Sequence, residues 1–452
     1  MRETPSSSRP ARRSVLQGTA AAAALGLAGC ADQLRTGDGA AAPAAGSAPA
    51  VSPGASTGGS ARTIRIGYVT PQTGALAPFG EADSFVVDQV TQYFAENGLQ
   101  TGAGRSDVEI IVKDTQSDST NAADAASELI LDDQVDLVLV GSTPDTTNPV
   151  ADQCEANGVP CLSSLAPWQP WFLGRGGDPE NPFRWTYHFF WGLEDVIAVF
   201  TDLWGSVETN RTIGALWPND PDGNAWGDPE LGFPPPAQEA GYTIVDPGFY
   251  ANGTQDFTAQ ISAFKEAGAE ILIGVPIPPD FTTFWDQAGQ QDFRPRMATV
   301  GKALLFPSSI AAVGERGNNL STEVWWSPSH PYTSSLTGQS AAELAEAWTE
   351  ATGQPWTQPI GFVHALFEVA AAAFAETSGP DDRQGLVDAL AGLQVDTVVG
   401  TVDWTAGPVP NVAKTKLVGG QWRTGSGEPE LVIVSNAQAP EIPTAGEVEA
   451  LA

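Results

Sequence analysis

The sequence predicts an α/β protein in which parallel sheets are covered by helices on both faces. Strand-like and helix-like segments alternate with short links over residues 63–162, and the same alternation returns over 211–291. Segments such as 135–140 are continuously apolar, as expected of strands that are buried on both faces. Since 452 residues are too many for one compact core, we expect about two doubly wound lobes.

The first series opens at residues 63–69, where apolar side chains alternate as in a strand. It predicts strands at 63–69, 108–112, 135–140 and 159–162, and helices at 81–97, 120–132 and 147–156. The later part of the chain predicts strands at 211–217, 243–245 and 270–275, and helices at 234–240, 256–267, 281–291, 341–352, 361–377 and 382–393. No short internal repeat is visible, so the two series are a duplicated architecture rather than a repeated sequence.

The first thirty residues resemble an export signal. Arg12-Arg13 precedes an Ala-rich apolar stretch, as in twin-arginine signals, and Leu27-Ala28-Gly29-Cys30 resembles a bacterial lipobox. The alternative is a chance arginine pair before a membrane helix, but the run 18–29 has twelve residues and a bilayer needs about 20. We therefore expect 1–29 to be a signal peptide, Cys30 to carry lipid, and 30–61, rich in Ala, Gly, Ser and Pro, to be a flexible tether. This places the protein on the outer face of the cytoplasmic membrane.

Charge and motifs exclude several classes of function. The 54 acidic and 21 basic residues give a net charge of −33, which argues against nucleic-acid binding. The three histidines, His188, His330 and His364, are not near a Gly-x-Ser-x-Gly elbow, which does not occur, and no HExxH motif is present. We therefore expect no enzyme activity, no metal site and no cofactor.

Cys154 and Cys161 are the only cysteines besides Cys30. The first ends a predicted helix, and the second lies in a strand after an Asn-Gly turn. An exported protein meets an oxidising environment, which favours a disulfide between them. The alternative is a pair of buried free thiols.

In doubly wound sheets, ligands bind beyond the carboxyl ends of the strands. This rule nominates the loops after Val69, Val140, Leu162 and Val275. The loop after Val140 is rich in hydroxyls and leads into a helix, so it offers oxygens and free N–H groups to an anion, although simple N-capping uses the same residues.

Several segments, in a fixed order and spacing, carry a resemblance to a known family. They are 66–74, 79–82, 135–141, 148–152, 158–163, 183–184, 256–261 and 400–404. Over about residues 62–425 the chain resembles the branched-chain amino-acid (Leu/Ile/Val-binding) type of ABC-transporter solute-binding lipoprotein, which has the type I periplasmic-binding fold. The resemblance implies two α/β lobes joined by three chain crossings, with ligand clamped between them. It places lobe 1 at 62–186 plus 312–412, lobe 2 at 187–311 plus 413–440, and a tail at 441–452.

The resemblance also implies which residues bind the ligand. Thr146 and Thr147, with Asp145 beside them, would hold a carboxylate, and Phe79 would cover the ligand. The remaining implied positions are Ser164, Ala166, Trp168, Asp222, Trp226 and Ile277. Trp168 departs from the family, which has a small residue and a threonine here. The alternative for Trp168 is packing against the hinge side of the lobe.

Lys302 is the sharpest departure from the family. Amino-acid binders of this type have an acid near this place to pair with the ligand's ammonium. A lysine would repel an ammonium and attract a carboxylate or another acceptor. The alternative is a surface lysine in a loop that aligns imperfectly. If the alignment holds, the ligand is anionic, an amide or aromatic rather than a simple α-amino acid.

The sequence thus predicts the extracytoplasmic solute receptor of an ABC importer. Its ligand would be amino-acid-like, an amide, or an aromatic or short carboxylate. Its partners would be the permease and ATPase subunits and, through lipid on Cys30, the membrane; we expect a monomer that binds no nucleic acid. The alternative is a lipoprotein of the same fold that signals to a membrane receptor instead of feeding transport.

Overall fold

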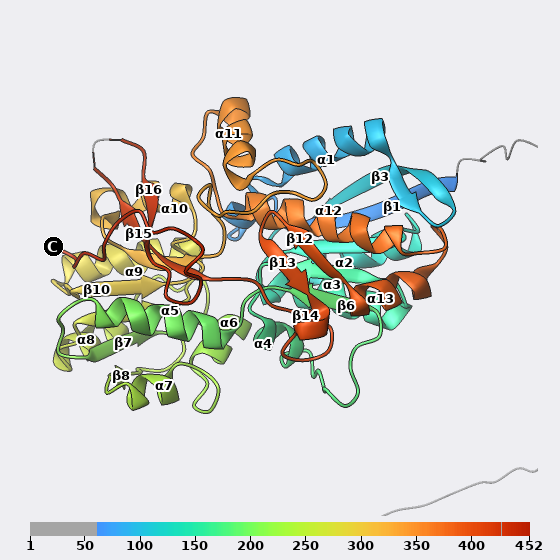
Figure 1. Cartoon of the computed structure of the whole chain (residues 1–452). Helices are drawn as coiled ribbons and strands as arrows, with labels where there is room; N and C mark the ends of the chain where they lie inside the picture. Colours follow the sequence, from blue (N-terminus) through green and yellow to red (C-terminus); the bar gives the residue numbers. More distant parts are fainter. Residues whose placement is uncertain (1–60, 426) are drawn as a thin grey trace, which may run out of the picture. The chain divides into compact units, whose positions relative to one another are not determined.

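The computed structural model describes residues 61–425 and 427–452 and contains two seven-stranded sheets (Figure 1). In the first sheet the order is β14-β6-β5-β4-β1-β3-β2, and every neighbouring pair is parallel except β2 with β3. The strands are β1 (Ala61–Thr70), β2 (Leu99–Thr101), β3 (Gly104–Asp114), β4 (Leu137–Gly141), β5 (Cys161–Ser164), β6 (Thr186–Phe189) and β14 (Val412–Ala413). This sheet and its helices are called the first lobe below.

The helices of the first lobe come from two separate stretches of chain. They are η1 (Ala77–Gly80), α1 (Asp83–Asn97), α2 (Ser119–Leu131), α3 (Pro144–Asn157), α4 (Trp168–Phe172), α11 (Ala341–Thr352), α12 (Pro359–Ala375), α13 (Arg383–Gly392) and η3 (Trp404–Ala406). A two-stranded ribbon, β12 (Gln394–Thr397) with β13 (Gly400–Asp403), follows α13. Helix α3 begins earlier than expected because Pro144, whose fixed φ suits the first helical turn, starts it.

The second sheet has the order β16-β15-β11-β10-β9-β7-β8 and defines the second lobe. Its strands are β7 (Thr212–Leu216), β8 (Thr243–Val245), β9 (Ile271–Gly274), β10 (Met297–Val300), β11 (Ser321–Val324), β15 (Val418–Arg423) and β16 (Glu430–Ser435). Strand β15 pairs in antiparallel fashion with both β11 and β16. Its helices are α5 (Leu193–Gly205), α6 (Pro221–Trp226), α7 (Pro234–Glu239), α8 (Thr258–Glu266), α9 (Pro278–Gln290), α10 (Pro307–Val313) and η2 (Gly314–Gly317). The predicted α/β class with mainly parallel sheets is therefore confirmed.

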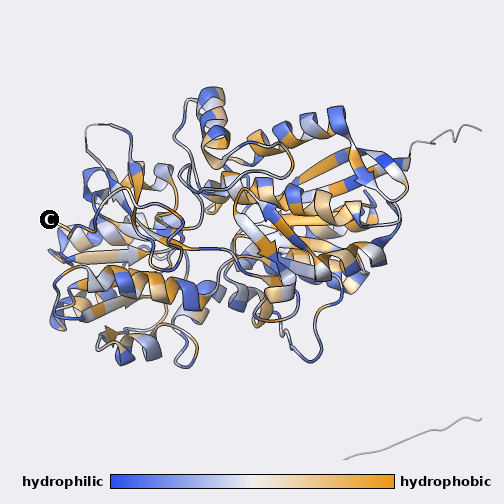
Figure 2. Ribbon diagram, viewed as in Figure 1, coloured by the Kyte–Doolittle hydropathy of each residue, from blue (hydrophilic) through white to orange (hydrophobic). Residues whose placement is uncertain are grey.

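Hydrophobic residues, orange in Figure 2, gather on the strands and on the helices that cover them. Helix α12 is buried along nearly its whole length, which explains its almost uninterrupted apolar sequence. By contrast, α11 buries Ala341, Leu344, Ala345 and Trp348 on one side, and it begins with a capping box made by Ser340 and Glu343.

The chain passes between the two sheets three times, after β6, after β11 and after β14, as the fold prediction requires. The crossings differ from the expected lobe boundaries. Strand β6 belongs to the first sheet, although residues after 186 were assigned to lobe 2. Strand β11 belongs to the second sheet, although 312–412 was assigned to lobe 1. Two crossings touch, because Phe190 packs edge-on against Trp325 with ring centroids 5.5 Å apart.

Cys154 and Cys161 are free thiols in the structure, so the expected disulfide is not formed. Both are fully buried in an apolar cluster between α3 and β5, and burial raises the pKa of Cys154 well above its usual value. A buried thiol with a raised pKa is a poor nucleophile, so Cys154 is unreactive in the native protein. The cysteines therefore act as small apolar side chains.

We expect both thiols to resist iodoacetamide in the native protein and to react after denaturation without any reductant. The reason is that both have no exposed surface and neither is oxidised. Mass spectrometry of the denatured, alkylated protein measures this. A mass lower by two hydrogens and no alkylation at either position would contradict it.

Within the described ranges, no helix combines the length and apolar character that crossing a bilayer requires. Arg12, Arg13, the apolar run 18–29 and Cys30 all lie outside those ranges. The predicted signal peptide, lipid site and tether therefore stay predictions.

Candidate ligand-binding site

One cavity lies where the carboxyl ends of strands from both sheets meet. Its lining residues lie at the end of a strand, in the loop that follows it, or in the short helices η1 and α6. They are Phe79, Thr143, Leu165, Pro167, Phe190 and Trp191 from the first lobe and its crossing, and Asp222, Trp226, Val275, Lys302, Leu305, Glu323 and Trp325 from the second. This is the position that the topology of doubly wound sheets assigns to ligands.

Five aromatic residues contribute to the cavity wall. Phe79 of η1 packs edge-on against Phe306 of the second lobe, with centroids 4.8 Å apart, so it bridges the two lobes. Trp226 packs against Phe200, with centroids 5.7 Å apart. The volume is about 20 Å³, which is room for about one water molecule. A larger ligand requires these side chains, or the lobes that carry them, to move apart.

Lys302 lies in this cavity, but its charge is already paired. Its Nζ is 2.9 Å from Oδ2 of Asp220 and 2.9 Å from Oδ2 of Asp222, and all three side chains are almost fully buried. Burial alone would lower the pKa of Lys302, but Asp220, Asp222 and the more distant Asp145 raise it well above its usual value. The expectation that Lys302 is free to attract a ligand carboxylate is therefore corrected, because two carboxylates of the chain surround it.

The two aspartates are held differently. Burial would raise the pKa of Asp220, but Lys302, the N–H of Gly223 and the amide of Asn252 outweigh it and lower the pKa. Burial raises the pKa of Asp222, which has Lys302 as its partner and the negative Asp220 beside it. Oδ1 of Asp222 has no hydrogen-bond partner in the described part of the chain. Asp222 therefore offers one acceptor that is not used by the protein.

The hydroxyl-rich loop after β4 presents further unused polar groups. The hydroxyls of Ser142, Thr143 and Thr146 are buried and lack partners among residues 61–425 and 427–452. Thr147 is different, because its hydroxyl donates to the carbonyl of Ser142 over 3.1 Å. Burial raises the pKa of Asp145 to about 6, opposed by Lys302. Of these hydroxyl residues, Thr143 lines the cavity, whereas Asp145 lies outside the lining and faces the charge of Lys302 in the second lobe.

The structure brings four of the predicted site residues into the cavity lining and leaves the others outside it. Those in the lining are Phe79, Asp222, Trp226 and Lys302; those outside are Asp145, Thr146, Thr147, Ser164, Ala166, Trp168 and Ile277. Trp168 begins α4 and donates its indole N–H to Glu194 over 3.1 Å, which matches the alternative of packing near a crossing. Whether the four residues bind ligand stays a prediction.

The positions of Ser164, Ala166 and Ile277 follow from local structure. The hydroxyl of Ser164 donates to the carbonyl of Phe189 over 2.6 Å, and the carbonyl of Ala166 accepts from the ring of His188 over 2.7 Å. Ile277 precedes the first turn of α9. These groups support the walls of the site without lining the cavity.

Sequence reasoning missed several lining residues, among them Phe190, Trp191, Leu305, Glu323 and Trp325. They follow or end β6, β10 and β11, which mix polar with apolar residues and were not predicted as strands. Leu165 was also missed. It has a positive φ of 69°, which is unusual for a residue with a large side chain.

Glu323 makes the stability of the site depend on pH. Burial raises its pKa to about 7, well above the usual value of a glutamate. A raised folded pKa means that its contribution to stability is full below the unfolded pKa and is lost as the pH rises through the folded pKa. We expect the Tm of Glu323→Gln to fall less between pH 4.5 and pH 7 than that of the wild type, measured by circular dichroism. The exposed Glu350→Gln is the control, and parallel profiles for Glu323→Gln and wild type would contradict the prediction.

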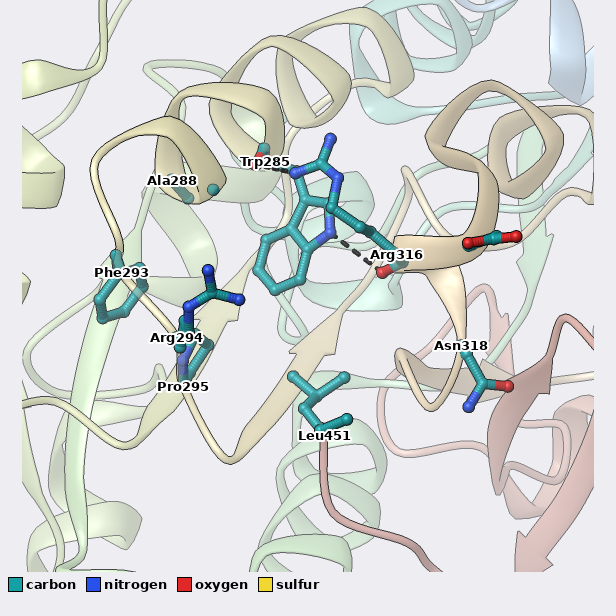
Figure 3. Close-up of a pocket in the computed structure, with 11 residues that line it drawn as sticks. Trp285, Ala288, Phe293, Arg294, Pro295, Arg316, Asn318 and Leu451 are labelled. Carbon is teal, nitrogen blue, oxygen red and sulfur yellow. Dashed lines mark hydrogen bonds between the residues drawn. The ribbon is translucent and has the colours of Figure 1, made fainter.

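A second cavity, shown in Figure 3, lies in the second lobe near the amino end of β10. Its volume is about 220 Å³, and Trp285, Arg294, Arg316 and Leu451 are among its lining residues. Its arginines are already paired, Arg294 with Asp292 and Arg316 with Asp286. The smaller cavity is the better candidate because it lies at the carboxyl ends of the strands and contains unused polar groups.

Solved structures share this architecture. The leucine-binding protein LivK of Thermotoga maritima is 18% identical, with a TM-score of 0.66 over 83% of this chain and 99% of that chain. A solute-binding protein of an ABC transporter from Rhodopseudomonas palustris, in complex with 3,4-dihydroxybenzoic acid, is 17% identical, with a TM-score of 0.66 over 84% and 99%. LivJ of Streptococcus pneumoniae, in complex with isoleucine, is 15% identical, with a TM-score of 0.63 over 82% and 99%. At these identities the likeness establishes the fold.

Among curated proteins, none matches the chain. A family model described as "Periplasmic binding protein" matches residues 63–425, which is most of the chain and includes the whole cavity. The type I periplasmic-binding fold implied by the sequence resemblance is confirmed by this match and by the shared architecture. The chain therefore belongs to the periplasmic binding protein family, and it is a binding protein rather than an enzyme, as its sequence predicts.

Proposed function

We propose that the protein is the solute-binding component of an ABC importer. It binds a small organic ligand between its lobes and delivers it to a membrane permease. The observation that carries this proposal is the cavity lined from both sheets by loops at the carboxyl ends of their strands. A ligand held by both lobes couples its own binding to their closure, which a permease reads as the loaded state.

The ligand proposed here has an apolar, planar part and at least one acceptor group. The planar part of the ligand would lie against the flat apolar rings of Phe79, Phe190 and Trp325. The free hydroxyl of Thr143 and the free indole N–H groups of Trp226 and Trp325 suit a carboxylate or carbonyl; no partner for them lies in the described ranges. The fold is known with isoleucine and with 3,4-dihydroxybenzoic acid in other proteins. An aromatic or short carboxylate, an amide or an amino-acid-like molecule therefore remains the proposed class.

Binding is proposed to involve hinge motion. Contacts between the lobes include the rings of Phe79 and Phe306, the hydroxyl of Ser308, which donates to Glu81 over 3.3 Å, and the packing of α6 against α3 and α4. The crossings after β6, β11 and β14 are the segments that can bend when these contacts separate. Opening admits a ligand that the present volume of about 20 Å³ excludes.

A thermal-shift screen of the exported protein tests the proposal. Suitable probes are 4-hydroxybenzoate, benzamide, isoleucine and leucine. A probe at a hundred times its dissociation constant stabilises the folded state by about 2.7 kcal/mol. Phe79→Ala should weaken the response, whereas Phe249→Ala, at an exposed position, should not. A stabilising probe whose effect is unchanged in Phe79→Ala would place the ligand elsewhere, and no response to any small organic solute would contradict the proposed function.

We further propose attachment to the membrane through lipid on Cys30, which lies outside the described residues. Cys30→Ala is expected to release the protein from the membrane fraction, because lipid supplies the apolar anchor. Fractionation of cells followed by immunoblotting measures this, with Cys154→Ala as a control that retains the anchor. Membrane retention of Cys30→Ala equal to wild type would refute the lipoprotein assignment.

A further inference from the structure

Lys302 places an ammonium group in the ligand cavity from within the chain. Its Nζ is 2.9 Å from Asp220 and 2.9 Å from Asp222. Asp220 is the N-cap residue of helix α6, and Asp222 lies in the first turn of that helix. Asp145 of the first lobe adds to the attraction on this ammonium. A nest of carboxylates around one cation is the arrangement by which proteins hold a buried ammonium. Here the cation is supplied by the protein itself.

The backbone is strained at the residue that carries this cation. Lys302 has a φ of 58°, in the left-handed region that residues with side chains rarely adopt. Such strain persists where the surrounding structure determines it, and it gathers at functional sites. Glu323 lies beside the main chain of Lys302 and lines the same cavity. The conformation directs the side chain toward α6 instead of toward solvent.

Asp222 keeps one unused acceptor beside this pair. Its Oδ2 holds Lys302, whereas its Oδ1 is buried with no partner in the described part of the chain. Since Asp222 lines the cavity, the group that completes it must come from whatever occupies the cavity. That group is an O–H or N–H donor, because the oxygen of a carboxylate accepts. Lys302 balances only one of the two carboxylates that it contacts.

We propose that Lys302 is a built-in counter-ion that fills an ammonium site between Asp220 and Asp222 and fixes Asp222 so that its Oδ1 accepts from an O–H or N–H donor of the ligand. This rests on the proposed function, since it specifies the ligand of the same cavity. Lys302 thus acts through Asp222 as a positioning residue.

Chemical rescue tests the proposal in the full chain without knowledge of the natural ligand. Lys302→Ala removes three methylene groups and the ammonium, which n-propylammonium restores. We expect n-propylammonium to recover at least half of the Tm lost in Lys302→Ala and to leave the wild type unchanged, while 1-propanol recovers none. Adding Asp222→Asn to Lys302→Ala should abolish the rescue. The exposed Lys265→Ala is the matched control and should not respond.

The proposal is overturned if n-propylammonium raises the Tm of Lys302→Ala no more than it raises the Tm of wild type or of Lys265→Ala. Should Lys302→Ala fail to fold, Lys302→Met is the second variant, because methionine refills the stem and leaves only the ammonium position empty. Ammonium chloride should then raise its Tm above that in sodium chloride of equal ionic strength, and equal values would overturn the proposal. These readouts do not depend on transport or on an identified solute, so failure of the proposed function would be seen separately.

Discussion

Lys302→Met is expected to lower the free energy of unfolding by about 3–5 kcal/mol, the range found when one partner of a buried ion pair is removed. The variant leaves Asp220 and Asp222 as buried carboxylates without their cation. Methionine has nearly the same length as the lysine stem, so loss of packing contributes little. Denaturant unfolding followed by tryptophan fluorescence measures the change.

The charge origin of this loss is tested by a second substitution. Asp222→Asn in the Lys302→Met background removes one of the stranded charges, so the double variant should be more stable than Lys302→Met alone. Asp220 keeps the N–H of Gly223 and the amide of Asn252 as partners in both variants. Lys265→Met, at an exposed position, should stay within about 0.5 kcal/mol of wild type. A similarly small effect of Lys302→Met would show that the ion pairs contribute nothing.

Trp226→Ala is expected to cost about 3–5 kcal/mol, as large-to-small substitutions of buried aromatic residues do. Trp226 is 1% exposed and packs against Phe233, with centroids 5.1 Å apart, as well as against Phe200. It belongs both to the core of the second lobe and to the cavity wall. The substitution therefore enlarges the cavity at the expense of the core.

Trp226→Phe separates these two roles. Phenylalanine keeps an aromatic ring in the cluster and should cost less than half as much as alanine, while it removes the free indole N–H from the cavity. Equilibrium unfolding in denaturant measures stability, and the response to any stabilising probe measures binding. Phe249→Ala is the exposed control. A loss of stability in Trp226→Ala below about 1 kcal/mol would contradict the packing described here.

The site shows how far local sequence patterns reach. The loops after β1, β4, β5 and β9 were nominated from strand ends alone, and each contributes to the cavity lining. That rule works because the carboxyl ends of parallel strands meet at one edge of a sheet. It does not say which side chain of a loop turns inward, and Trp168 turns away because α4 begins there and Glu194 accepts its indole N–H.

Strands β6, β10 and β11 mark the first limit of sequence reasoning, because they were not predicted. Each mixes polar with apolar residues, so none is a continuous apolar run such as β9. Their pairing in the middle of the sheets defines them, and that pairing joins residues far apart in the chain. For the same reason the lobe boundaries expected near 186 and 312 do not coincide with the crossings after β6 and β11.

The sequence by itself determined the α/β class, the two series of strands and helices, the binding-protein family and the loops that form the site, because these follow from periodicity, strand order and motif spacing. Only the tertiary structure decided that Cys154 and Cys161 are free thiols and that the charge of Lys302 is balanced. Asp220 and Lys302 are 82 positions apart, and their contact arises when α6 and the loop after β10 meet at one end of the second sheet. The partners of a buried charge depend on such long-range packing, which no local pattern in the sequence records.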